Sequence, residues 1–192
     1  MRWLAVVCFV LLPLPAAAEW QVKPFFGIAF GGSTSFVDYE NAAGRKHLVL
    51  GLGTSLLGEV LGLEADVARV PGFFQDSGEF VSGSSATTLT GNIVVALPKR
   101  MSQYTLRPYF VAGAGIIRAQ IDGGFGTLHV SSTLPAMDLG GGATGFLNNR
   151  VGLSWELRHF RSFKGKGQLA GSSFSKEQVA FWRATMALAF RY

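Results

Sequence analysis

The sequence predicts an all-β protein, namely an eight-stranded antiparallel up-and-down transmembrane β-barrel. Segments of about ten residues alternate apolar side chains with small or polar ones, which is the period of a strand with two different faces. The connections between these segments are alternately long and short. The mean hydropathy is high, at +0.30, although no segment beyond residue 18 has the run of about 18 apolar residues that a membrane-spanning helix needs.

The composition excludes several other classes of protein. The chain has 192 residues, of which 48% are hydrophobic and 15% charged, so it can bury a core and is not a disordered chain. Its 25 glycines follow no three-residue period, which excludes collagen. The formal net charge is +5, with the basic residues scattered singly, so we expect no nucleic-acid partner. No His, Cys or Asp cluster has metal-ligand spacing, and we expect no metal or other cofactor.

Residues 1–18 are predicted to be an export signal peptide. Arg2 supplies the basic start, residues 4–14 the apolar stretch, and residues 16–18 an A-x-A cleavage site. The alternative is a short membrane anchor, for which the apolar stretch is too short. The only cysteine, Cys8, lies inside this segment. We therefore expect a cleaved, exported chain in which residues 19–192 form one outer-membrane β-barrel domain.

The first four strands are predicted from apolar residues at nearly every second position. These segments are residues 22–30, 48–53, 61–68 and 88–97. The third has a helical alternative, because Leu56, Val60, Leu63 and Val67 also have helical spacing. The strand interpretation is preferred because the neighbouring segments contain glycine too often for stable helices.

The last four strands follow from the same period. They are predicted at residues 106–116, 139–147, 151–158 and 182–192. The sixth strand is the weakest of the eight, because residues 140–142 are all glycine. The eighth is clear, because Trp182, Met186 and Leu188 alternate with Arg183 and other residues of the mixed face.

The predicted connections give the chain two different ends. The long ones are residues 33–46, 72–86, 119–136 and 161–177, and the short ones are residues 57–59, 98–104 and 148–150. In an up-and-down barrel this alternation places four long loops at one end and three short turns at the other. Outer-membrane barrels have long outer loops and short periplasmic turns.

The two faces of the strands indicate which side meets lipid. The apolar face is predicted to face acyl chains and comprises Phe26, Ile28, Phe30, Leu50, Leu63, Ile93, Phe110, Trp155, Met186 and Leu188. A lipid-facing Arg or Lys at the bilayer midplane would cost about 2–4 kcal/mol, so the charged face must be the interior. Eight strands leave a lumen that side chains can fill.

An interior charge network is therefore predicted on the mixed face. Its members are Lys23, Glu64, Asp66, Arg107, Asp138, Glu156, Arg158, Arg183 and Arg191. We expect Glu64 and Asp66 to pair with Arg107 or Arg183 and not to form a metal site. The glycine runs at residues 113–115 and 140–142 are interpreted as small interior positions and not as phosphate-binding loops, which would have to join a strand to a helix.

Aromatic residues near the predicted strand ends suggest the girdles found at membrane interfaces. This group comprises Trp20, Tyr104, Tyr109, Trp182, Phe190 and Tyr192.

Several local sequences resemble the outer-membrane β-barrel domain family, which includes the OmpA-like and opacity-type eight-stranded barrels. The resemblance lies in K-P-F-F-G at residues 23–27, L-R-P-Y-F-V-A-G-A-G at 106–115, N-R-V-G-L at 149–153 and E-L-R-H-F at 156–160. It implies an integral outer-membrane protein surrounded by outer-membrane lipid and lipopolysaccharide. It also implies delivery by periplasmic chaperones and recognition by the barrel-insertion machinery, with Leu188, Phe190 and Tyr192 as the insertion signal.

These features favour a structural or surface-interaction role, in which a narrow barrel displays four outer loops, and we expect no enzymatic activity. One alternative is a small-solute pore. Another is a lipid A hydrolase built on Glu156, His159 and Ser162, although the spacing of these residues differs from the motif of that family. The third is a soluble lipocalin-like carrier.

Overall fold

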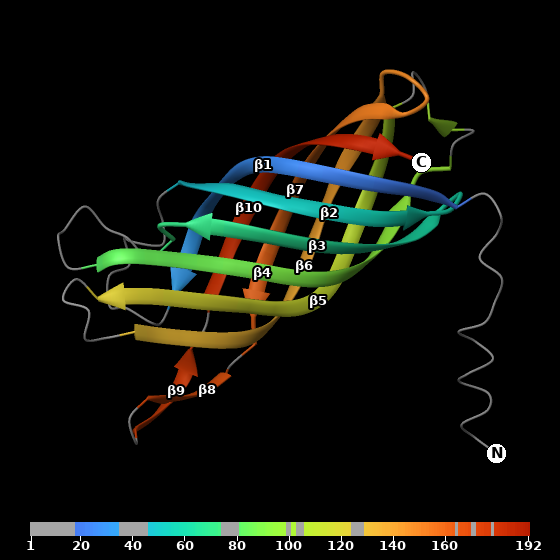
Figure 1. The fold of residues 1–192 in the computed structure, drawn as a ribbon. Helices are drawn as coiled ribbons and strands as arrows, with labels where there is room; N and C mark the ends of the chain where they lie inside the picture. Colours follow the sequence, from blue (N-terminus) through green and yellow to red (C-terminus); the bar gives the residue numbers. More distant parts are fainter. Residues whose placement is uncertain are drawn as a thin grey trace, which may run out of the picture.

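The computed structural model describes residues 18–34, 46–73, 81–98, 101–102, 106–123, 129–163, 165–169, 172–177 and 179–192. In these residues eight antiparallel strands form a closed barrel (Figure 1). They are β1 (Glu19–Thr34), β2 (His47–Leu57), β3 (Leu61–Pro71), β4 (Val81–Ala96), β5 (Leu106–Gly123), β6 (His129–Phe146), β7 (Val151–Ser162) and β10 (Val179–Arg191). Their order around the barrel is β1-β10-β7-β6-β5-β4-β3-β2, so the predicted fold class is confirmed.

Pairing of the first strand with the last closes the barrel. Phe26 of β1 lies opposite Met186 of β10, and the backbone N–H of Tyr192 donates to the carbonyl of Trp20 at 2.9 Å. Both ends of the barrel-forming chain therefore lie at the end that carries the short turns, and the long connections lie at the other (Figure 1). We call these the turn end and the loop end. Among the described residues there is no helix long and apolar enough to span a bilayer.

The structure corrects two details of the predicted elements. The helical alternative over residues 56–70 is wrong, because β3 occupies most of that segment and alternates exposed with buried residues. Several strands also continue into segments predicted as loops: β4 begins at Val81, β5 reaches Gly123 and β6 begins at His129. The reason is that backbone pairing continues towards the loop end, where Ser, Thr and Gly predominate in β4 and β6, and where the apolar residues of β5, such as Ile117, change from the outer to the inner face.

A second sheet lies within the fourth predicted loop. Strands β8 (Gly165–Leu169) and β9 (Ser172–Glu177) pair as an antiparallel hairpin, which was not predicted (Figure 1). The signal for it is weak because the segment is short and rich in Gly and Ser. The predicted signal peptide, apart from Ala18, lies outside the described residues, as do parts of all four predicted loops.

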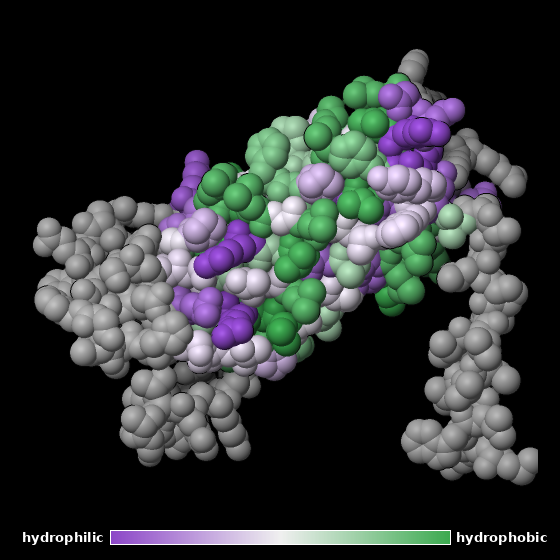
Figure 2. Space-filling view, viewed as in Figure 1, coloured by the Kyte–Doolittle hydropathy of each residue, from purple (hydrophilic) through white to green (hydrophobic). Residues whose placement is uncertain are grey.

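The barrel wall has the predicted orientation. Phe110 is 74% exposed, Ile93 58% and Leu188 48%, whereas Glu64, Asp66 and Arg183 are each less than 5% exposed. Hydrophobic side chains cover the middle of the barrel surface, and hydrophilic ones lie towards its ends (Figure 2). The opposite arrangement, with apolar side chains inside and charges outside, would have excluded a membrane barrel.

The interior is divided into layers along the barrel axis. An apolar cluster fills the loop-end half and includes Phe73, Phe160 and Phe181, with Val70 and Ile117. Buried charged side chains lie next to it, and a smaller apolar cluster that includes Leu57, Val94 and Tyr109 lies towards the turn end. The sequence interpretation described the interior as charged and small, so the apolar cluster is a correction. It arises because side chains at every second position continue to point inward beyond the charged residues, and these positions are then occupied by apolar residues such as Phe160.

Candidate functional site

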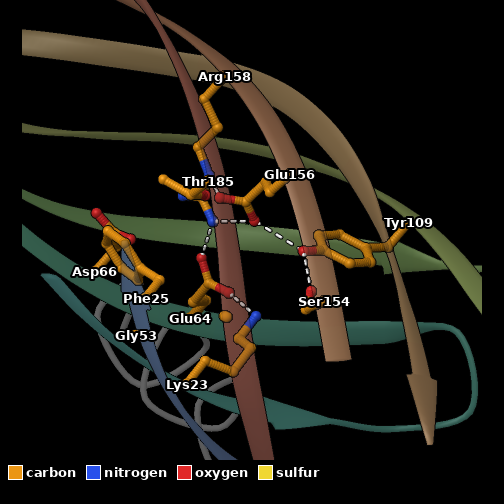
Figure 3. A pocket seen from close by; sticks show the side chains of 11 residues that line it. Lys23, Phe25, Gly53, Glu64, Asp66, Tyr109, Ser154, Glu156, Arg158 and Thr185 are labelled. Atoms are coloured by element: carbon orange, nitrogen blue, oxygen red, sulfur yellow. Dashed lines mark hydrogen bonds and ion pairs between the residues drawn. The ribbon is translucent and has the colours of Figure 1, made fainter. Parts of the chain in front are cut away.

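The charged layer of the interior is centred on Glu64 of β3. Its carboxylate accepts a hydrogen bond from Lys23 Nζ of β1 at 2.5 Å and another from Arg158 Nη2 of β7. The side chains of all three residues are at least nine-tenths buried. Figure 3 shows them meeting inside the barrel, with dashed lines joining Glu64 to Lys23 and to Arg158. Glu64 therefore links strands that are not neighbours in the barrel wall.

Arg158 connects Glu64 to two further carboxylates. Its Nε donates to Glu156 Oε1 at 2.5 Å, and its Nη1 lies 3.2 Å from Asp138 Oδ2 on β6. Asn92 of β4 bridges this group in the amide orientation that suits its neighbours: its nitrogen donates to Asp138 at 2.9 Å, and its oxygen accepts from Arg158 at 2.7 Å. The guanidinium is therefore enclosed by acceptors.

A second ion pair lies beside this group. Arg183 of β10 donates to Asp66 of β3 through both terminal nitrogens, at 2.8 and 2.9 Å. Its guanidinium also lies 4.8 Å from the centre of the Phe25 ring and 4.7 Å from that of Phe160, so it contacts aromatic faces as well as a carboxylate. Arg183 thus joins the charged layer to the apolar cluster on its loop-end side.

Four carboxylates and three basic side chains make up this layer. The surplus negative charge is placed beside neutral donors, since Tyr109 Oη donates to Glu156 at 2.9 Å and Asn92 donates to Asp138. Hydrogen bonds of this kind are needed because an unpaired buried charge is far more costly than an unpaired surface charge. The layer is therefore a nearly neutral cross-link inside the barrel.

Little space remains within the charged layer. The cavity lined by Lys23, Glu64, Tyr109, Glu156 and Arg158 has a volume of about 10 Å³. That is about the space required for a single water molecule. In the part of the chain that the structure describes, the charged side chains and the apolar cluster thus occupy successive sections of the lumen.

Two residues predicted to belong to the network lie elsewhere. Arg107 does not pair with Glu64 or Asp66. Its Nη2 donates to the carbonyls of Gly58 and Glu59, at 2.9 and 2.6 Å, and its Nε to that of Leu97 at 2.9 Å. The expectation that it would neutralise an interior carboxylate is wrong because Arg107 is the second residue of β5, beside the turns.

Arg191 lies at the same end of the barrel. Its Nη1 is 3.3 Å from Glu19 Oε1, and its guanidinium lies 4.3 Å from the centre of the Phe146 ring. Its Nε donates to the carbonyl of Asn149 at 2.9 Å. Arg191 therefore joins the last strand to the first at the seam and is not part of the central layer.

The aromatic residues predicted to form the girdles also lie in different environments. Trp20 and Tyr192 are 51% and 80% exposed at the turn end, with ring centres 6.0 Å apart, and Trp182 is exposed towards the loop end. Phe190 is partly exposed, and Tyr104 lies outside the described residues. Tyr109 is 6% exposed and points inward, so its assignment to a girdle is wrong. Tyr109 is two residues from Arg107 on the same strand, so the two side chains point to the same side of the wall. This spacing would have placed Tyr109 in the interior.

The structure does not bring Glu156, His159 and Ser162 together. Glu156 points inward to Arg158 and Tyr109, whereas the His159 ring contacts Trp182 at 4.8 Å on the other face of β7. Ser162 is buried, and its Oγ accepts the backbone N–H of Val179 at 2.8 Å. Nucleophile and base would need to lie within hydrogen-bond reach of each other. Among the residues with described positions, no His, Cys, Asp and Glu are grouped to hold a metal ion.

Sequence reasoning missed three kinds of interior residue. Asn92 and Tyr109 complete the hydrogen bonding of the carboxylates, and the Phe73, Phe160 and Phe181 rings fill the apolar cluster at centre-to-centre distances of 5.0 and 5.1 Å. Phe160 shares inward parity with Glu156 and Arg158, so the period alone could have found it. The position of Phe73, which follows the end of β3, has no such signal.

A closed barrel with an apolar outer wall and neutralised charges inside defines an integral membrane β-barrel. The particular kind follows from comparison with known proteins. The chain belongs to the outer membrane protein beta-barrel domain family, whose model matches residues 4–179. It is therefore an outer-membrane barrel protein.

Solved structures with the same fold come from several bacteria. Neisserial surface protein A is 13% identical with a TM-score of 0.60, and the match covers 88% of this chain and 96% of that one. A major outer membrane protein of Thermus thermophilus is 15% identical, with a TM-score of 0.57 and coverage of 92% and 100%. Ail of Yersinia pestis, in complex with the heparin analogue sucrose octasulfate, is 13% identical, with a TM-score of 0.53 and coverage of 91% and 99%. Comparison with curated proteins gives no match. At these identities the likeness shows the fold alone.

Proposed function

We propose that this protein has a structural or surface-interaction role, in which a narrow, side-chain-filled barrel displays four loops outside the cell. The single observation that carries the proposal is the filling of the interior by two layers. Lys23, Glu64 and Arg158 cross the lumen with a cavity of only about 10 Å³ beside them. Phe160 and Phe181, stacked at 5.0 Å, fill the half towards the loops.

The surface role is supported by the geometry of such a scaffold. Loops carried by a rigid barrel are the usual location of recognition, because the scaffold holds them without having to change shape. The fold is shared with Ail, which is described as an attachment invasion locus protein. The proposed surroundings are outer-membrane lipid and lipopolysaccharide, reached through periplasmic chaperones and the barrel-insertion machinery after cleavage of residues 1–18.

Conductance in planar bilayers tests the role against that of a small-solute pore. We expect purified, refolded protein to produce no current steps under conditions in which a general porin, added as a control, conducts. A filled interior offers no continuous water path. Regular current steps from the wild-type protein would overturn the proposal. Heat-modifiable gel mobility would establish beforehand that the reconstituted protein is folded.

We also propose that the protein is not a lipid A hydrolase. The support is the placement of His159 and Ser162 on opposite faces of β7, where no proton transfer between them is possible. Mass spectrometry of lipid A after incubation with the purified protein tests this. We expect unchanged masses, and loss of an acyl chain that depends on Ser162 would contradict it.

A further inference from the structure

A row of polar residues crosses the outer surface of four neighbouring strands. Arg69 of β3 lies opposite Thr87 of β4, Thr87 opposite Arg118 of β5, and Arg118 opposite Thr133 of β6. Residues directly opposite each other in antiparallel strands share a face of the sheet. Arg69, Arg118 and Thr133 are exposed and Thr87 is partly exposed, so this face is the outer wall. We call these four residues the arginine row.

The arginine row lies directly beside the apolar belt. Two residues nearer the turn end on each strand, the outward positions are apolar, namely Val67, Leu89, Ile116 and Pro135. The apolar series on β3 continues to Leu61, at the turn end. At ~3.3 Å per residue and a tilt of ~40°, Arg69 lies roughly 20 Å above Leu61 along the barrel axis, comparable to the ~25 Å height of the apolar band in such barrels.

This position is the boundary between acyl chains and headgroups at the loop end. Hydrophilic side chains lie next to the hydrophobic belt over the loop-end parts of β3, β4 and β5 (Figure 2). Because the long connections of outer-membrane barrels face outward, this boundary belongs to the outer leaflet. The inference rests on that orientation, which is part of the proposed function.

Neither arginine is neutralised by a residue that the structure describes. Arg69 and Arg118 form no hydrogen bond or ion pair within this part of the chain. The carboxylates with described side chains on β3–β6, Glu64, Asp66 and Asp138, all point inward. Strands β3–β6 thus bury these three carboxylates inside, while the two guanidinium groups outside have no described carboxylate beside them. An anion from the surroundings of the protein would neutralise the charge of the two guanidinium groups.

The spacing of the arginine row suits one phosphate group. Arg69 and Arg118 are two strands apart, roughly 10 Å between backbones at ~4.8 Å per strand. Both side chains are long enough to converge above Thr87, which lies between them in the register of the three strands. A guanidinium presents a fork of donors that matches phosphate oxygens, and two forks with a hydroxyl satisfy a phosphate from three sides.

We propose that Arg69, Thr87 and Arg118 bind a phosphate group of an anionic lipid in the outer leaflet. A lipid is favoured over a soluble phosphate compound because the exposed apolar side chains of Val67, Leu89 and Ile116 adjoin the site. A bilayer covers these side chains with acyl chains, so the acyl part of the same molecule would lie along them. Thr133 extends the polar row to the next strand.

Binding of bisphosphorylated lipid A to the intact barrel tests this proposal. Wild-type protein and the variant Arg69→Gln/Arg118→Gln would be reconstituted in phosphatidylcholine nanodiscs containing a small fraction of lipid A, and protein-bound lipid A measured by native mass spectrometry. Since two charge-assisted contacts are removed, we expect the double variant to lose about tenfold in affinity. Thr87→Val, which keeps all charges, should lose less, about threefold.

Two matched variants control for charge alone. Arg150→Gln removes an exposed arginine from the turn end, and Arg161→Gln removes a single outward arginine from β7. Both should bind lipid A as the wild type does. Equal binding by the double variant, an equal loss in Arg150→Gln, or undiminished binding of dephosphorylated lipid A would overturn the proposal. Heat-modifiable mobility shows that each variant is folded. Bilayer conductance is a separate readout, so failure of this site does not imply failure of the closed barrel.

Discussion

Arg183 of β10 and Asp66 of β3, 117 positions apart in the sequence, form two hydrogen bonds of 2.8 and 2.9 Å inside the barrel. The two strands are not neighbours in the wall, since β1 and β2 lie between them. The pair is therefore a strut across the interior. Both side chains are almost completely buried, so its energetic role differs from that of a surface ion pair.

Removing one partner of this strut should be strongly destabilising. Asp66→Asn keeps the shape of the side chain and leaves the Arg183 charge buried without its carboxylate. We expect the free energy of unfolding to fall by about 3–5 kcal/mol, the cost of breaking a buried pair. Urea titration in detergent micelles, followed by gel mobility, measures the change. Asp66→Leu/Arg183→Met removes both charges and should recover part of the loss; a single variant as stable as the wild type would contradict the strut.

The layered interior predicts how conductance responds to mutation. Glu64→Gln removes the carboxylate shared by Lys23 and Arg158, but the apolar layer at Phe160 and Phe181 still excludes water. We expect Glu64→Gln to remain silent in planar bilayers, as should Phe160→Ala/Phe181→Ala. The three substitutions together should give measurable current steps. Conductance by Glu64→Gln alone would show that the apolar layer is no barrier.

Glycines of β5 and β4 give a matched test of interior packing. A Cβ added to Gly115, which faces the interior, would lie 1.9 Å from the carbonyl oxygen of Leu89, whereas one added to Gly91 would meet nothing within 4 Å. Gly115→Ala should lower the free energy of unfolding by about 1–3 kcal/mol, the usual cost of overpacking. Gly91→Ala should be neutral or stabilising, by up to about 1 kcal/mol. Urea titration compares the two, and equal effects would contradict this packing.

The two environments of tyrosine can be separated by removing a hydroxyl. Tyr109 Oη lies 2.9 Å from Glu156 and 3.1 Å from Ser154 in the interior, while Tyr192 is 80% exposed. Tyr109→Phe leaves a buried carboxylate with one donor fewer and should destabilise the barrel by about 1–3 kcal/mol. Tyr192→Phe should change the stability by less than about 0.5 kcal/mol. The same urea titration measures both; a larger effect at Tyr192 would show that Tyr109 is not structural.

The alternation of residue types was sufficient to predict the barrel and its two faces. Leu61 and Leu63 alternate with Glu64 and Asp66 on one strand, and since side chains on a strand point alternately to its two sides, that pattern assigns lipid and lumen without any tertiary information. The same period failed towards the loop end. There the outward residues become polar, and the apolar residues of β5 change to the inner face, so the outward apolar alternation no longer marks the extra length of β4, β5 and β6.

The partners inside the barrel could not be predicted in this way. Parity places Glu64 and Arg107 on the same inner face, yet Glu64 pairs with Lys23 and Arg158, while Arg107 binds turn carbonyls. A strand's parity specifies a side of the wall but not a height along the axis or a position around the ring. Those depend on the closure of β1 on β10 and on the register of every pair.

By itself the sequence determined that this chain is a lipid-facing, eight-stranded barrel with its charges inside, because a two-residue period is a local property of the backbone. Only the tertiary structure decided that Asp66 faces Arg183, that Tyr109 lies inside, that phenylalanines fill the loop-end half and that Arg69 and Arg118 flank Thr87. These contacts join residues far apart in the chain, and their geometry exists only once the ring of strands is closed.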